Sequence, residues 1–438
     1  AVLPLAHHGI KFALAHPQLI EEELMATIDE FTSDSTVQMA VQSAKAACVG
    51  KQISDIIDND GFQYVDFVME GGGVLGIALT GYTYVLEQAG IRFLGIGGTS
   101  AGSINALMIA AMGPPAAAKS EQLLSVLAAM PMATFIDGDQ DARDFSQAAL
   151  EKASMMKLLL KGMQVIDNLR DDLGLNPGTK FFDWLKTELE NVGIDTNADL
   201  SKRLQTVPRG LRLREKRTDT ALKPDDMYGK LIMIAADITT ETKVEFPRMA
   251  ELYWAYPDRI TPAYFARASM SIPFFFHPFQ VDSCPQNATK WAELAGYHGT
   301  LPETVLFIDG GIMSNFPINA FHQPYRVPAS PTFGAKIGQD RAQAAVITKP
   351  SQLLGAVFDA ARHTLDFDFI SQNPDYRHLV AMIDTGDHNW LDFNMDDNSK
   401  IDLFARGAKK AAEFLQGFDW GKYKQIRKGI AEAFMTNG

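Results

Sequence analysis

The sequence predicts an α/β protein in which helices cover a mainly parallel sheet. Residues 64–70, YVDFVME, form an apolar β-rich run that ends in three glycines, and a helical pattern follows over 77–90. Residues 91–97, IRFLGIG, repeat this order, with a second glycine turn and a helical pattern over 101–112. Strand, glycine turn and helix in alternation are typical of parallel strands joined by crossover helices. Four more strands are predicted at 230–240, 242–248, 304–311 and 379–387.

The remaining segments divide the chain into three parts. Apolar residues recur at spacings of three and four over 17–58, which predicts an N-terminal helical segment, 1–60, packed on the core. The central domain, 61–390, is interrupted by a helical, methionine-rich insertion at 116–200 that we expect to form a cap. Within it, residues 153–169 fit either a core helix or an apolar lid. Two packing helices are expected in the last part, 391–438.

Composition limits the kinds of partner. The chain has 438 residues, 46% of them hydrophobic, and a formal net charge of -13, so general attraction to nucleic acid is not expected. The two cysteines provide neither a CxxC metal site nor a disulfide framework, which favours a reducing, cytoplasmic location. No apolar run approaches the roughly 20 residues of a membrane-spanning helix, so any membrane contact is expected to be peripheral.

The first chemical motif is the glycine turn of MEGGGVLGIAL. Gly71-x-Gly73-x-x-Gly76 matches the dinucleotide-binding pattern, but the acidic residue expected about 20 positions later is absent from FLGIG. Gly71, Gly72 and Gly73 are instead candidates for an oxyanion hole, because glycine backbones can aim unobstructed amides at a developing negative charge. A tight strand-to-helix turn is the structural alternative.

The second motif, IGGTSAG, places Ser100 between Gly98 and Gly102. A preceding strand and a following helix are the setting of a nucleophile elbow, in which the serine stands at a helix N-terminus. An ordinary helix-capping serine would give the same pattern. Ser100 is therefore a candidate nucleophile that requires a base.

Two kinds of base are available. Histidine is the usual partner of a serine, and the downstream candidates are His322, His363, His378 and His388. Of these, His388 in DTGDHNW is the one that fits a loop after a strand with an acid before it. Asp309 is the better candidate, because it ends the apolar strand TVLFID and is followed by Gly310 and Gly311, which permit a sharp turn. An apolar wall would raise the pKa of this carboxyl and make it a stronger base.

Taken together, these motifs resemble the patatin-like phospholipase family. The resemblance spans about 62–320 and rests on EGGGVLG, IGGTSAG, AADITTETKVEF, ARASMSIPFFFHPF and FIDGG, in this order. It implies a three-layer α/β/α fold and a Ser–Asp dyad without histidine. Ser100 would be the nucleophile, Asp309 the base, and the Gly71–Gly73 turn the oxyanion hole. No metal and no cofactor are implied.

One residue departs from the family pattern. The glycine motif usually continues with a cation, and Leu75 stands at that position. The implied activity is hydrolysis of fatty-acyl esters in phospholipids or lysophospholipids through an acyl-enzyme. The alternatives are a lipid transacylase and a nucleotide-regulated module with weak hydrolysis.

Three weaker signals bear on binding. Residues 202–217 hold seven Lys or Arg, which fit a solvated loop, a contact with phospholipid head groups or a site for a nucleotide regulator acting as a small-molecule activator. SIPFFFHPF, at 271–279, fits either an acyl channel or an aromatic core cluster. The sequence from residue 137 begins like a calcium-binding loop, with Asp137, Asp139 and Asp141 at the ligand positions. Ala142 and Ala148 replace the glycine and the glutamate of that pattern, so no metal is expected.

Overall fold

A computed structural model of the chain describes residues 27–138, 173–214, 227–323, 326–338, 344, 347–348 and 350–437. The predicted helical residues 17–26 and the candidate lid 153–169 lie outside the described residues. So do Asp139 and Asp141 of the calcium-like motif.

The core is a mixed sheet with a parallel centre. Strands β12, β11, β2, β3 and β6 lie side by side and parallel, in that order. Their bounds are Val380–Ile383, Thr332–Ile337, Gln63–Met69, Ile91–Thr99 and Lys230–Asp237. β3 is buried along its whole length, as a strand covered on both faces must be.

Antiparallel strands complete the sheet on the β6 side. β7 (Thr242–Phe246) and β10 (Thr304–Asp309) both pair with β6, and β9 (Phe279–Asp282) pairs with β10. The short strands β1 (Ile56–Ile57) and β5 (Arg212–Leu213) pair with each other beside β2. A separate parallel pair is formed by β4 (Gly174–Asn176) and β8 (Phe274–Phe276).

Helices cover both faces of this sheet. α3 (Gly76–Gln88) joins β2 to β3, and α4 (Ala101–Ala111) follows β3. Right-handed crossovers place these two helices on one face and α14 (Pro350–Gln372), which joins β11 to β12, on the opposite face. The predicted three-layer α/β/α class with a mainly parallel sheet is confirmed.

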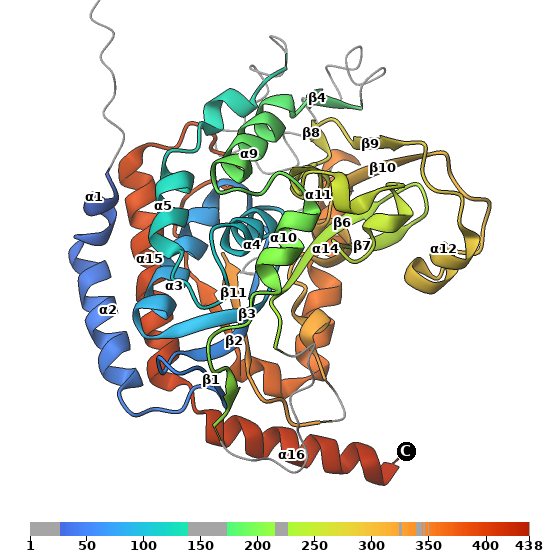
Figure 1. The fold of residues 1–438 in the computed structure, drawn as a ribbon. Helices are drawn as coiled ribbons and strands as arrows, with labels where there is room; N and C mark the ends of the chain where they lie inside the picture. Colours follow the sequence, from blue (N-terminus) through green and yellow to red (C-terminus); the bar gives the residue numbers. More distant parts are fainter. Residues whose placement is uncertain are drawn as a thin grey trace, which may run out of the picture.

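An outer layer of helices packs on α3. α15 (Asp397–Gly417) lies against α3, and α2 (Ser35–Cys48) packs on α15, with α5 (Ser120–Ala128) beside α3 (Figure 1). The crossing is close because each helix has a glycine at the contact. A Cβ on Gly407 would lie 1.8 Å from the Ala78 carbonyl oxygen, and one on Gly81 would lie 2.0 Å from that of Phe404.

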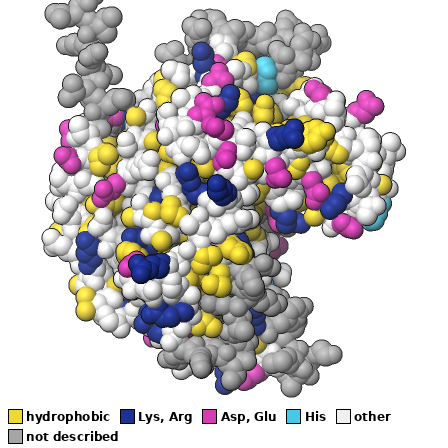
Figure 2. Space-filling view, viewed as in Figure 1, with side chains coloured by type: hydrophobic (Ala, Val, Ile, Leu, Met, Phe, Trp, Pro, Cys, Tyr) yellow, Lys and Arg dark blue, Asp and Glu magenta, His cyan; other side chains and the backbone are white. Residues whose placement is uncertain are grey.

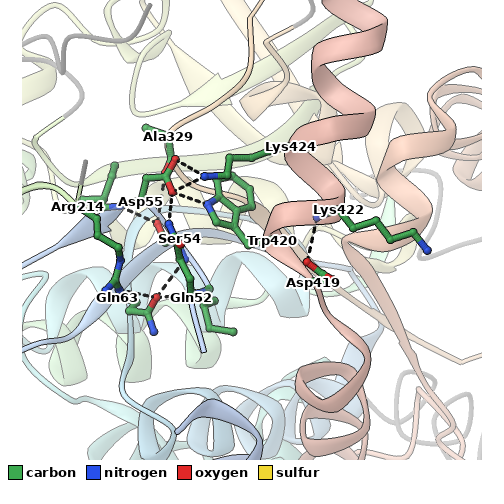
Figure 3. A network of polar contacts seen from close by, with 12 residues as sticks. Gln52, Ser54, Asp55, Gln63, Arg214, Ala329, Asp419, Trp420, Lys422 and Lys424 are labelled. Atoms are coloured by element: carbon green, nitrogen blue, oxygen red, sulfur yellow. Dashed lines mark hydrogen bonds and ion pairs between the residues drawn. The ribbon is translucent and has the colours of Figure 1, made fainter. Parts of the chain in front are cut away.

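The C-terminal helix α16 (Trp420–Asn437) is held by a polar network (Figure 3). The buried Asp55 carboxylate accepts hydrogen bonds from Trp420 Nε1 at 2.7 Å and from Lys424 Nζ at 2.9 Å. Arg214 joins the network through Gln63 Oε1 at 3.1 Å. α15 and α16 are the two helices expected in the C-terminal part of the chain.

The remaining described helices include α1 (Ile28–Thr32), α9 (Thr179–Asn191), α10 (Asn197–Leu204), α11 (Ala263–Ser269), α12 (Ala288–Ala295) and α13 (Gly311–Ser314). Short 3-10 turns, including η1 (Gly73–Leu75), η2 (Met132–Phe135), η6 (Ile318–Phe321) and η7 (Pro374–His378), link several of them. The sequence did not predict two elements that are central to the fold, strand β11 and helix α14. β11 reads TFGAKI, which has a glycine in its middle and a buried lysine, so it lacks the apolar run of its neighbours.

Candidate active site

The sheet itself brings Ser100 and Asp309 together. β3 runs parallel to β6 and ends with Thr99 opposite Ile234. β10 runs antiparallel to β6 and ends with Asp309 opposite Ala235. Because β3 and β10 approach along the same edge of β6 from opposite directions, their ends meet at adjacent residues. The nucleophile candidate therefore follows one strand end, and the base candidate ends the other.

Ser100 has the strained backbone of a nucleophile elbow. Its φ is 51° and its ψ is -121°, a conformation that L-residues rarely adopt. The Ser100 amide donates to Ser269 Oγ at 2.9 Å, which ties the turn to the end of α11. Gly98 and Gly102 are required by space, since a Cβ on Gly98 would lie 2.3 Å from the Gly102 carbonyl oxygen.

The Asp309 carboxylate is buried and lies beside Ser100, where the two strand ends meet. Burial raises the pKa of this carboxyl, while Arg362, the Ser100 hydroxyl and the Gly311 amide each lower that pKa. The Gly311 amide donates to Asp309 Oδ1 at 2.7 Å. A Cβ on Gly310 would lie 2.1 Å from the Ile234 carbonyl oxygen, so glycine is needed where the chain turns away from β6. The arrangement places a buried carboxyl group, the base candidate, next to the candidate nucleophile.

The glycine turn lies beside Ser100, and its amides differ in their hydrogen bonding. The Gly71 amide, a predicted oxyanion donor, donates to the Asn315 carbonyl oxygen at 3.1 Å in this structure. Within the described residues, the Gly72 and Gly73 amides have no hydrogen-bond acceptor. Gly73 has a φ of +56°, and a Cβ there would lie 2.1 Å from the Trp390 carbonyl oxygen. Gly72 and Gly73 remain the donor candidates.

An apolar pocket opens at Ser100. Its walls come from the glycine turn, α4, η2, α9, the segment after α11, and the chain before α15. The lining residues are Gly73, Val74, Ser100, Ala101, Ile104, Met130, Met132, Phe135, Phe181, Met270, Ile272, Phe276 and Phe393. Met270, Ile272 and Phe276 belong to the stretch ARASMSIPFFFHPF, so part of this stretch does face the pocket. Apart from Ser100, every lining side chain is apolar, which suits a hydrocarbon chain.

None of the histidine candidates whose side chains the structure describes contacts Ser100. His322 Nδ1 contacts Tyr376 Oη at 2.8 Å, and His388 Nε2 contacts Asp402 Oδ2 at 2.8 Å. His378 is exposed at the end of η7. The side chain of His363 lies outside the described residues. Asp309 is the base candidate that the described part of the chain brings to Ser100.

Three arginines of the basic stretch 202–217, Arg203, Arg212 and Arg214, make hydrogen bonds within the fold. Arg203 donates to the Val192 carbonyl oxygen at 2.8 Å, and Arg212 donates to Asn59 Oδ1 at 3.0 Å. On the face shown in Figure 2, Lys and Arg side chains lie among Asp and Glu side chains. Residues 215–217 are not described.

Asp137 belongs to the calcium-like motif but has a structural role in the fold. Asp137 accepts the Gly178 amide at 3.0 Å and the Lys180 amide at 3.0 Å, so it caps α9. Across the described residues, no cluster of three or more His, Cys, Asp or Glu side chains is suited to a metal ion. None of the described helices is both long and apolar enough to cross a bilayer.

Sequence reasoning missed three residues that support the site. Ser269 lies within the motif ARASMSIPFFFHPF and Asn315 lies four residues after FIDGG, but their roles depend on contacts across the fold. Arg362 lies on α14, about 50 residues beyond the last motif, and no pattern in the sequence marks it.

Comparison with known proteins identifies the family. A family profile described as patatin-like phospholipase matches residues 67–322, more than half of the chain. The uncharacterized protein YqhO of Bacillus subtilis (strain 168) is 27% identical over 353 residues, which cover 81% of this chain and 98% of YqhO. The crystal structure of VipD from Legionella pneumophila aligns with 84% of this chain and 71% of VipD, at 13% identity and a TM-score of 0.38. On the strength of the profile match, the chain belongs to the patatin-like phospholipase family of lipid hydrolases.

Proposed function

We propose that the chain hydrolyses fatty-acyl ester bonds of phospholipids or lysophospholipids through a Ser100–Asp309 dyad. The observation that supports the proposal is the meeting of two strand ends on β6, which brings the buried Asp309 carboxylate beside Ser100 at an apolar pocket. Histidine is not needed, because partial desolvation already strengthens the carboxylate as a base.

Acylation begins with proton transfer. Asp309 takes the Ser100 proton as Oγ attacks the ester carbonyl, and the Gly72 and Gly73 amides stabilise the tetrahedral oxyanion. When the intermediate collapses, the C–O bond to the leaving alcohol breaks and Asp309 returns the proton to that oxygen. The acyl chain stays on Ser100, with its hydrocarbon in the apolar pocket.

Deacylation uses the same groups. Asp309 accepts a proton from water as the water attacks the acyl-enzyme, and it then protonates Ser100 Oγ as the fatty acid leaves. Deacylation therefore returns the dyad to its starting state.

The experiment compares two variants with two controls. Ser100→Ala and Asp309→Asn should each abolish release of fatty acid from phospholipid and lysophospholipid vesicles and labelling by a fluorophosphonate. The control variants change the same residue types at exposed positions, Ser125→Ala on α5 and Asp368→Asn on α14, and should behave as the unmutated chain.

Mass spectrometry then locates the label. Modification at a serine other than Ser100, or full activity in Asp309→Asn, would refute the dyad. Hydrolysis of simple short-chain esters without any release from phospholipid or lysophospholipid would refute the substrate assignment.

A further inference from the structure

The cation that the glycine motif lacks is present nearby, on another element. Leu75 is buried in the hydrophobic core, with 6% of its surface exposed, and brings no charge to the site. Arg362 reaches the same loop from α14, on the opposite face of the sheet from α3. Its Nη2 donates to the Gly71 carbonyl oxygen at 2.8 Å.

A second donor acts on the same carbonyl. Asn315 Nδ2 donates to the Gly71 oxygen at 3.1 Å. The peptide joining Gly71 to Gly72 is planar and trans, so its N–H points away from its C=O. Two donors that hold the Gly71 oxygen therefore orient the Gly72 amide in the opposite direction. They also polarise the peptide, which makes that amide a stronger donor.

Asp366, one helical turn after Arg362, fixes the position of α14 at the site. Asp366 accepts hydrogen bonds from Ser314 Oγ at 2.9 Å and from the Phe316 amide at 2.6 Å, which ties α14 to the segment after Asp309. Residues four apart lie on the same helix face, so this anchor directs Arg362 to the same region. The guanidinium also lies over the Trp390 ring, 5.5 Å from its centroid.

Arg362 also affects the base. Its Nε is buried without a hydrogen-bond partner in the described part of the chain, and it would lie 3.4 Å from a Cβ on Gly311. The same Cβ would lie 2.8 Å from Asp309 Oδ1, so the cation and the carboxylate flank Gly311. The positive charge lowers the pKa of Asp309 against the effect of burial. Three other charged groups pack near this loop. Asp366 is hydrogen-bonded to Ser314 and Phe316, and Lys336 is paired with Glu70, which precedes Gly71.

We propose that Arg362 is a positioning residue that replaces the missing cation of the glycine motif. It orients the Gly72 amide through the Gly71 carbonyl and keeps Asp309 ionised. The inference rests on the proposed dyad, because both effects act on the groups that Ser100 and its substrate use.

Three substitutions separate hydrogen bonding from charge. Arg362→Ala loses both, Arg362→Gln keeps a donor for the Gly71 oxygen without the charge, and Arg362→Lys keeps the charge. Arg377→Gln removes a cation from an exposed position in η7 and is the matched control. For each variant, kcat and KM are measured from pH 4 to 9 on the same ester, with the fluorophosphonate labelling rate.

Arg362→Ala should lower kcat by about 10- to 100-fold with little change in KM, less than the loss of a direct oxyanion donor. In Arg362→Gln the acid limb of kcat/KM should move upward by about one pH unit, because Asp309 loses a neighbouring cation. Arg362→Lys should keep the limb at its original pH. The control should match the unmutated chain.

Unchanged kcat and an unchanged acid limb in Arg362→Gln and Arg362→Ala would overturn the inference. If Arg362→Ala does not fold, the comparison of the Gln and Lys variants decides, and equal acid limbs in those two would also overturn it. Activity that survives Ser100→Ala would instead refute the proposed function, so the two failures are distinguishable.

Discussion

Replacing Lys336 by methionine should strongly destabilise the fold. Lys336 Nζ lies 3.0 Å from Glu70 Oε1, and both side chains are almost fully buried, with 6% and 2% of their surface exposed. The same carboxylate accepts the Ile337 amide at 2.8 Å. Glu70 immediately precedes the glycine turn, so this pair joins β11 to the start of the candidate oxyanion loop.

The magnitude follows from distance and burial. At 3.0 Å the attraction between unit charges is about 5 kcal/mol at an effective dielectric constant of about 20. Removing the lysine forfeits this attraction and leaves a buried carboxylate with its full desolvation cost. We expect a loss of about 3–5 kcal/mol in the free energy of unfolding, whereas the double variant Glu70→Gln with Lys336→Met should lose far less.

Urea denaturation followed by tryptophan fluorescence measures these free energies. Lys410 and Glu413 form the matched control, because their Nζ to Oε2 distance is also 3.0 Å but 35% and 48% of their side-chain surface is exposed. Lys410→Met should cost at most about 1 kcal/mol. Equal losses from Lys336→Met and Lys410→Met would refute the argument from burial.

Three further predictions concern the site. Gly310→Ala should remove fluorophosphonate labelling, because the new Cβ would collide with the Ile234 carbonyl oxygen and displace Asp309; normal labelling would contradict this. The kcat/KM of the unmutated chain should fall with acid through an apparent pKa above the ordinary aspartate range, since burial raises the pKa of the base that must be ionised; a plateau extending below pH 4 would exclude this. Met132→Trp should narrow the pocket, so hydrolysis of long-chain esters should fall more than that of short-chain esters, and an equal fall would place the acyl chain elsewhere.

Much of the site could be predicted because its chemistry is local. The elbow requires small residues on both sides of Ser100, and the turn after Asp309 requires glycine beside the Ile234 carbonyl. These steric demands leave short patterns that can be read without coordinates. The apolar runs of β2, β3, β6 and β10 are equally visible, because strands covered on both faces are continuously hydrophobic.

Other features depend on contacts between distant segments. Ser269 supports the Ser100 amide, and Asn315 occupies the Gly71 amide that was expected to face the substrate. Neither role leaves a pattern in the sequence. A hydrogen bond between distant segments constrains only the two residues that form it, and it does not fix their separation along the chain.

The sequence by itself determined the α/β class, the serine elbow and the aspartate turn, since each follows from backbone sterics and hydrophobic patterning within a few residues. Only the tertiary structure decided how they meet. β3 and β10 end at adjacent residues of β6, which sets Ser100 against Asp309. Helix α14 then brings Arg362 to a loop about 290 residues away in the chain, where a local cation is missing. The physical reason is that charge acts through space, so a cation can serve the site from any element that packs against it.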